Sequence, residues 1–152
     1  MFSFAFDCSG TYGMVLRALE VFNSARPHLP LVPRAILEAM VLSERPIGSA
    51  ETVASRLGLK NRFQLARLLR RHGLPPLHRL AGWVTILSWV LKAEETGASL
   101  SAMAFHSQRH PSACYRLVKE ITGRRWEQVL AQGSAWIQRA MLIELQGRQN
   151  RN

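Results

Sequence analysis

The sequence predicts an all-α protein: two helix-turn-helix units joined by a long linker helix, with extra helices at the N- and C-terminal ends. Three observations support this fold class. Apolar residues recur at helical spacing through most of the chain. The segment 49–73 has a counterpart in 99–123. With 47% hydrophobic residues, a chain of 152 residues can bury a core of its own.

The first 32 residues form an extension ahead of the repeated units. Phe2, Phe4 and Phe6 alternate with smaller residues, which is typical of a short strand or of an ordered tail that clamps onto the core. Helical spacing predicts a helix over 12–24. The proline-rich segment 26–33 is expected to be a linker, and Pro33 suits the first turn of the next helix, which runs to about residue 43.

The segment 49–73 predicts a short helix, a tight turn and a second helix rich in arginine. Ser49 is a favourable N-cap, and Glu51 lies in the first turn, where the helix dipole favours an anion. Gly58 supplies the left-handed backbone position that such a turn needs. In the second helix one face is apolar and the other is basic. The predicted inward residues are Leu65, Leu68 and Leu69.

A longer helix is predicted over 77–94, after two prolines. Its length of about 27 Å is of the order of the roughly 34 Å between successive major-groove faces of B-DNA. Its dense apolar stripe is typical of a buried connecting helix and consists of Leu80, Trp83, Leu87, Val90 and Leu91.

The second unit, 99–123, repeats the order of short helix, turn and basic helix, and it ends at Gly123 as the first ends at Gly73. The predicted inward residues of its second helix are Cys114, Leu117, Val118 and Ile121. The tail 126–146 is expected to be mostly helical, and 148–152 to be a polar end. Two units on one chain provide two recognition helices without dimerisation, so we expect a monomer or a weak dimer.

Positive charge is concentrated in one block. Lys and Arg total 20 against 10 Asp and Glu, a formal net charge of +10. Residues 52–93 contain no acid, and their cations are Arg56, Lys60, Arg62, Arg67, Arg70, Arg71, Arg79 and Lys92. A solvated surface without a ligand usually mixes both signs, so this block favours a polyanionic partner, either nucleic acid or an acidic membrane surface.

Other classes of protein find little support in the sequence. Cys8 and Cys114 show no disulfide framework, no apolar run reaches a bilayer-spanning length, and no basic signal-peptide region opens the chain. We therefore expect a soluble protein of the bacterial cytoplasm, associated with the nucleoid. A P-loop, a carboxylate pair and a nucleophile elbow are lacking, so we expect no enzyme and no cofactor. His106, His110 and Cys114 have metal-ligand spacing, but Pro111 interrupts the helix that this spacing requires, and we expect no metal site.

Several ordered motifs carry a family resemblance, namely Glu51-Thr-Val-Ala54 with Arg56-Leu-Gly-Leu59, 65–73, Arg79-Leu80 with Ile86-Leu87, and 115–123. With these motifs, 33–129 resembles the double helix-turn-helix DNA-binding domain of AraC/XylS-type transcription regulators. The resemblance leaves 1–32 and 130–152 as N- and C-terminal extensions. It implies a transcription activator that binds double-stranded DNA and engages RNA polymerase.

The resemblance also implies DNA-binding residues. In the first recognition helix they are Arg62, Phe63, Gln64, Ala66, Arg67, Arg70 and Arg71. In the second turn and helix they are Arg109, His110, Ser112, Tyr115, Arg116 and Lys119. Arg67 can donate two hydrogen bonds to guanine and Phe63 can contact a thymine methyl group, although a core position for Phe63 is equally open. We place most of the base specificity in the first unit.

Two other functions remain open from the sequence. The same positive charge would serve a nucleoid or architectural protein that binds DNA without sequence preference. The terminal helices could instead bind a protein partner, with the repeated units vestigial.

Overall fold

Within residues 7–42 and 49–147, which the computed structural model describes, every regular element is an α-helix, so the all-α prediction is confirmed for them. No helix in these ranges combines the length and apolarity that a membrane crossing requires. The predicted strand or tail at 1–6 lies outside the described residues. In chain order the helices are α1 (Asp7–Ala25), α2 (Leu31–Leu42), α3 (Ala50–Arg56), α4 (Arg62–Arg71), α5 (Leu77–Thr96), α6 (Leu100–His106), α7 (Pro111–Thr122), α8 (Trp126–Gln132) and α9 (Ser134–Gly147).

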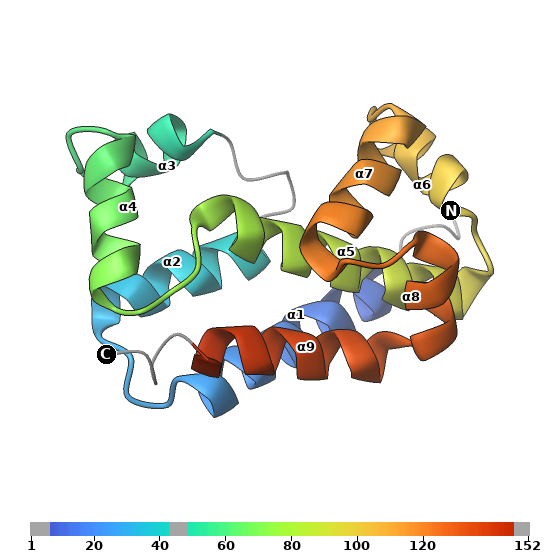
Figure 1. Cartoon of the computed structure of the whole chain (residues 1–152), viewed down its shortest axis with the longest axis horizontal. Coiled ribbons are helices and arrows are strands. Elements are labelled where there is room, and N and C mark those ends of the chain that lie inside the picture. Colours follow the sequence, from blue (N-terminus) through green and yellow to red (C-terminus); the bar gives the residue numbers. More distant parts are fainter. Residues whose placement is uncertain (1–6, 43–48, 148–152) are drawn as a thin grey trace.

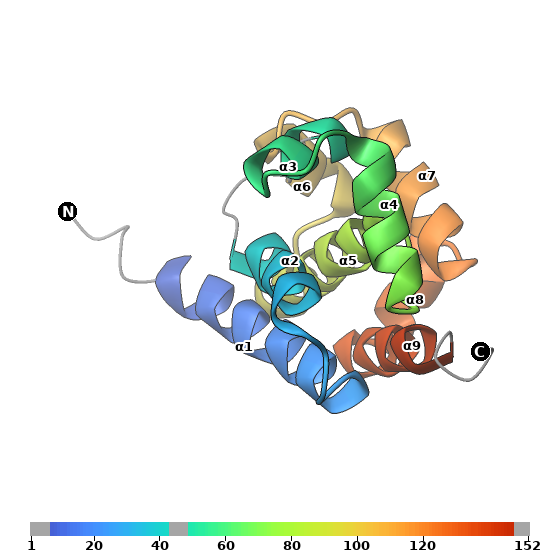
Figure 2. The same cartoon turned by 90° about the vertical axis from the view of Figure 1, so that its left-hand side faces the viewer.

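Helix α5 lies in the middle of the molecule, and the other helices are arranged around it (Figure 1). Its buried side chains point in several directions, so it packs against α1, α2, α6, α7, α8 and α9. The pairs α3–α4 and α6–α7 lie on one side of α5, and α1 and α9 pack against each other on the opposite side (Figures 1 and 2). The predicted core stripe of this helix is buried, apart from the half-buried Leu91.

Helix α5 approaches α7 closely at Gly82. A Cβ atom built on Gly82 would lie 2.7 Å from Cγ1 and 2.8 Å from Cδ1 of Ile121. Ile121 is itself buried, with 3% of its surface exposed. The absence of a side chain at Gly82 therefore lets α7 lie directly on α5.

Two sequence-based boundaries differ from the structure. Helix α1 begins at Asp7, five residues before the predicted start at 12. Helix α2 begins at Leu31, so the last part of the predicted linker 26–33 is helical; Pro33 fits there because amide groups in a first turn have no helical partner. The tail 126–146 is mostly helical, as predicted, and it consists of two helices, α8 and α9, separated at Gly133 (φ +85°).

We expect Gly82→Ala to lower the free energy of unfolding by about 1–3 kcal/mol, because the added methyl group meets Ile121 in a closed core. Gly13→Ala is the matched control: Gly13 also lies within a helix, but a Cβ there meets nothing within 4 Å. That control should leave stability unchanged or raise it by up to about 1 kcal/mol. Urea denaturation measures both. Equal effects of the two substitutions would contradict the close approach.

Candidate nucleic-acid interface

The first and second helix pairs, α3–α4 and α6–α7, begin in the same way. The hydroxyl of Ser49 accepts a hydrogen bond from the backbone N–H of Thr52 at 3.3 Å, which confirms the predicted N-cap. Ser99 does the same for Ala102 at 3.1 Å. Each short helix therefore starts at a serine that satisfies one of its free amide groups.

The two pairs also turn in the same way, although their turn residues differ. Gly58 adopts the predicted left-handed conformation with φ +73°, and Gln108 occupies the equivalent place with φ +56°. In each turn the next backbone N–H bonds back to a buried alanine carbonyl at 2.9 Å, from Leu59 to Ala54 and from Arg109 to Ala104. Gln108 thus takes the left-handed position that glycine takes in the first pair, at a conformational cost that glycine avoids.

The N-terminus of α4 is held by acceptors from the protein itself. The side-chain oxygen of Asn61 accepts from the backbone N–H groups of Phe63 and Gln64, both at 3.1 Å. Glu51 of α3 accepts from the N–H of Arg62 at 3.3 Å, which ties the two helices together. Gln64 accepts from the backbone N–H of Lys60 at 2.8 Å, so its amide oxygen stabilises the turn. These contacts set the direction in which α4 leaves the turn.

Helix α4 divides into an apolar and a basic face, as predicted. Leu65 and Leu69 are buried and Leu68 is half-buried. Phe63 is 60% exposed, with the Arg62 guanidinium 5.0 Å from its ring centre, so the core alternative for Phe63 is wrong. Its contact with a base stays a prediction. The other predicted DNA-binding residues on the exposed surface of this helix are Arg62, Ala66, Arg67, Arg70 and Arg71.

Helix α7 has the same division. Its buried residues are Cys114, Val118 and Ile121, and its exposed ones include Ser112, Tyr115, Arg116 and Lys119. The ring Nδ1 of His110 accepts from the backbone N–H of Ser112 at 3.2 Å, so His110 is the N-cap. Arg109 is half-buried, and its guanidinium lies 5.9 Å from the ring centre of Trp89. His110 and Arg109 therefore both have structural roles at the start of this helix.

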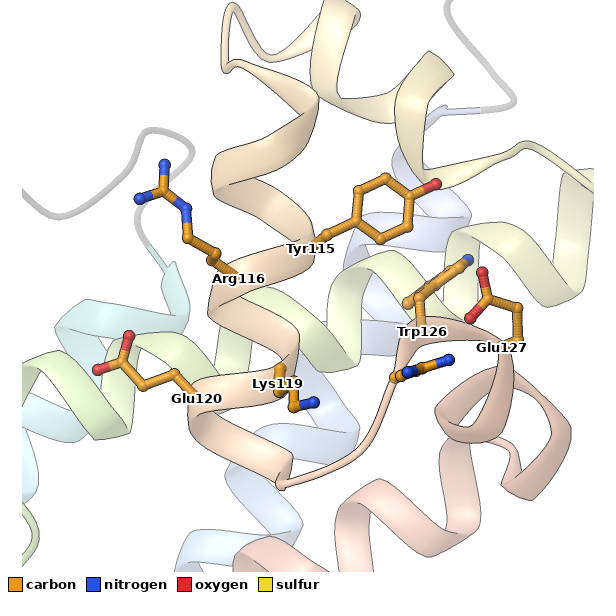
Figure 3. A pocket seen from close by; sticks show the side chains of 7 residues that line it. Tyr115, Arg116, Lys119, Glu120, Trp126 and Glu127 are labelled. Atoms are coloured by element: carbon orange, nitrogen blue, oxygen red, sulfur yellow. The ribbon is translucent and has the colours of Figure 1, made fainter.

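An open groove of about 710 Å³ lies between α7 and the start of α8. Tyr115, Lys119, Arg125 and Trp126 are among its lining residues. Figure 3 shows Tyr115 and Trp126 on one side of α7, while Arg116 points away on the other. Sequence reasoning missed Arg125 and the exposed Arg124, although an arginine pair directly after Gly123 was a usable signal. Arg125 lines the groove beside the acids Glu120 and Glu127, whereas the Arg124 guanidinium lies 5.0 Å from the ring centre of Trp136.

Two acids near these helices have partners within the protein. Glu51 accepts from the backbone of α4, and Glu120 lies 2.9 Å from His78. Between residues 49 and 73, all within the described chain, no cation forms a salt bridge. Exposed arginines without acidic partners create a positive potential that attracts polyanions.

Two further features bear on chemistry at this surface. Burial raises the pKa of the Cys114 thiol, and the nearby charge of Arg109 opposes this in part. Cys114 is 1% exposed, which makes it an unreactive core residue. Among the described residues, no three His, Cys, Asp or Glu side chains gather where they could hold a metal ion.

Comparisons with known proteins do not assign the chain to a family. No protein-family model matches it, and no curated protein or solved structure matches it. The resemblance to AraC/XylS-type regulators therefore stays a prediction that rests on the motifs of the sequence.

We expect Gln108→Gly to raise the free energy of unfolding by up to about 1 kcal/mol, because glycine adopts the left-handed conformation without strain. Gly58→Gln is the reciprocal control and should lower it by about 1–2 kcal/mol. A Cβ on Gly58 meets nothing within 4 Å, so the control reports backbone conformation alone. Urea denaturation of both variants is the measurement. A loss of stability in Gln108→Gly would show that the Gln108 side chain makes a contact worth more than the strain.

Proposed function

We propose that this protein is a sequence-specific, double-stranded DNA-binding regulator of transcription that inserts α4 and α7 into adjacent major grooves. The observation that carries the proposal is the placement of two amphipathic basic helices on one side of α5 (Figures 1 and 2). Helix α5 has 20 residues and is therefore about 30 Å long. A length of this order suits two helices that enter successive major-groove faces, about 34 Å apart.

The exposed side chains suggest a division of roles. Arg67 lies in the middle of α4, where its guanidinium can donate two hydrogen bonds to the O6 and N7 atoms of guanine. The exposed ring of Phe63 can contact a thymine methyl group. Arg62, Arg70, Arg71 and Lys119 are suited to phosphates, which add affinity without sequence information.

The second helix pair is suited to support binding rather than to read many bases. Ser112 shares a hydrogen bond of 2.7 Å with His110, and the Tyr115 hydroxyl lies 3.5 Å from Ser101, so both polar groups have partners in the protein. Arg116 and Lys119 remain exposed and positive. A role in activation through RNA polymerase rests on the family resemblance alone.

Footprinting on DNA selected from a random-sequence pool tests the proposal. We expect one discrete, asymmetric footprint that covers two adjacent major grooves and weakens as salt rises from about 50 to 200 mM, because phosphate contacts release counterions. A continuous smear would instead indicate a non-specific architectural protein. Absence of any protection at either salt concentration would favour a protein-interaction module.

We expect Arg67→Ala to weaken binding to the selected site by about 1–3 kcal/mol and to relax the preference at one base pair, with little effect on random DNA. Arg71→Ala is the matched control on the same helix. It should weaken both kinds of DNA alike and reduce the slope of log affinity against log salt by about 1. Titration of labelled DNA at several salt concentrations measures both. If Arg67→Ala also weakened both DNAs alike, base reading by Arg67 would be wrong.

A further inference from the structure

The carboxyl ends of the two basic helices are tied to neighbouring residues of α9. Arg26, which follows α1, donates from Nη1 to the carbonyl oxygen of Gly73 at 3.3 Å and to that of Leu145 at 3.4 Å. Its Nη2 donates to the carbonyl oxygen of His72. His72 is the C-cap of α4, and Leu145 lies in the last turns of α9. One guanidinium group therefore joins the end of α4 to the end of α9.

A second arginine makes the matching connection to α7. Arg79 of α5 donates from Nε to Glu144 Oε1 at 2.6 Å and from Nη2 to the carbonyl oxygen of Ile121 at 3.1 Å. The indole N–H of Trp83 donates to the other oxygen of Glu144. Glu144 and Leu145 are consecutive in α9, so this one turn is linked to the ends of both basic helices.

The environment of Arg26 suits a positioning role. It is only 9% exposed, and burial lowers its pKa because the charged form loses water. Its charge is compensated by carbonyl groups at the negative ends of two helix dipoles. A buried guanidinium whose donor loses its acceptor destabilises the folded protein. Displacement of either helix end would break such a hydrogen bond, so Arg26 opposes that displacement.

The packing of the first helix pair makes such a tie consequential. Within the described chain, α3 and α4 pack closely only on each other, whereas α7 packs on α5, α6 and α8. The fully buried core residues of this segment are Leu65 and Leu69 of α4, with Leu74 just beyond the helix. Apolar contacts of this kind keep α4 close to the rest of the protein but hold its orientation only weakly. Hydrogen bonds donated by a planar guanidinium are directional and hold the orientation more strongly.

We propose that Arg26 and the Arg79–Glu144 pair are positioning residues: they connect both basic helices to α9 and thereby hold α4 at a set orientation relative to α7. This proposal deepens the proposed function and rests on it in one respect, because the orientation would determine which spacing of two half-sites the protein accepts. Arg26 and Glu144 lie in the N- and C-terminal extensions, outside 33–129. The extensions thus set geometry for a domain that they flank.

A first experiment tests the positioning without DNA. Spin labels are attached at Ala66→Cys on α4 and Ala113→Cys on α7 in a Cys8→Ser background, with the buried Cys114 left in place. We expect Arg26→Met to make the distribution of distances between the labels roughly twofold broader, since the first pair loses its directional tie. Arg79→Met and the milder Glu144→Gln should broaden it as well. Far-UV circular dichroism checks that each variant is folded.

Arg34→Met is the matched control for this experiment. The Arg34 guanidinium also makes three hydrogen bonds, to Leu29, Asn23 and Pro27, but all of these partners lie in α1 or in the segment between α1 and α2. Its loss should leave the distribution unchanged. Distributions for Arg26→Met and Arg34→Met that both superimpose on the wild type, in folded protein, would overturn the proposal.

A second experiment connects positioning to DNA. The selected site is lengthened and shortened by one base pair between its half-sites. We expect the wild type to lose about tenfold in affinity on either altered site, and Arg26→Met to lose at most about threefold. Equal spacing dependence in both proteins would overturn the role of Arg26 in site choice. If the wild type selects no site, the proposed function fails, while the spin-label result still decides whether Arg26 holds α4 in place.

Discussion

A helix that is apolar on most of its surface must be covered on most of its surface, and α5 imposes this constraint on the molecule. Ten of its residues are buried, among them Trp83, Ile86, Leu87 and Val90. Six helices supply the cover, including α1 and α9 on the side away from the basic helices (Figure 2). The terminal helices are therefore part of one core, because without them α5 would expose a large apolar face to water.

Several acids of the described chain have structural roles. Glu94 accepts from the backbone N–H of Ser134 at 2.7 Å and from its hydroxyl at 3.0 Å, which caps α9. Glu51 joins α3 to α4, and Glu144 joins α5 to α9. With these carboxylates engaged, the arginines of α4 face solvent without salt bridges among the described residues. Exposed arginines without acidic partners give this side a positive potential.

Local signals in the sequence predicted the helices well and their connections less well. Ser49 and Gly58 mark the start and end of α3 through chemistry that acts within a few residues, so both were readable. The exposure of Phe63 was not readable, because helical spacing alone did not settle its register. The division of the tail at Gly133 was also missed, since the cap that begins α9 comes from Glu94, 40 residues earlier.

The sequence by itself determined the all-α class, the two amphipathic basic helices and the apolar helix between them, because spacing, capping and charge are properties of neighbouring residues. Tertiary structure alone decided how these parts are held. The lack of a side chain at Gly82 matters because Ile121 of α7 packs against it. Arg26 donates to the ends of α4 and α9, whose residues are 47 and 119 positions away in the sequence. Contacts between residues so far apart depend on the packed arrangement of the helices, which local patterns do not encode.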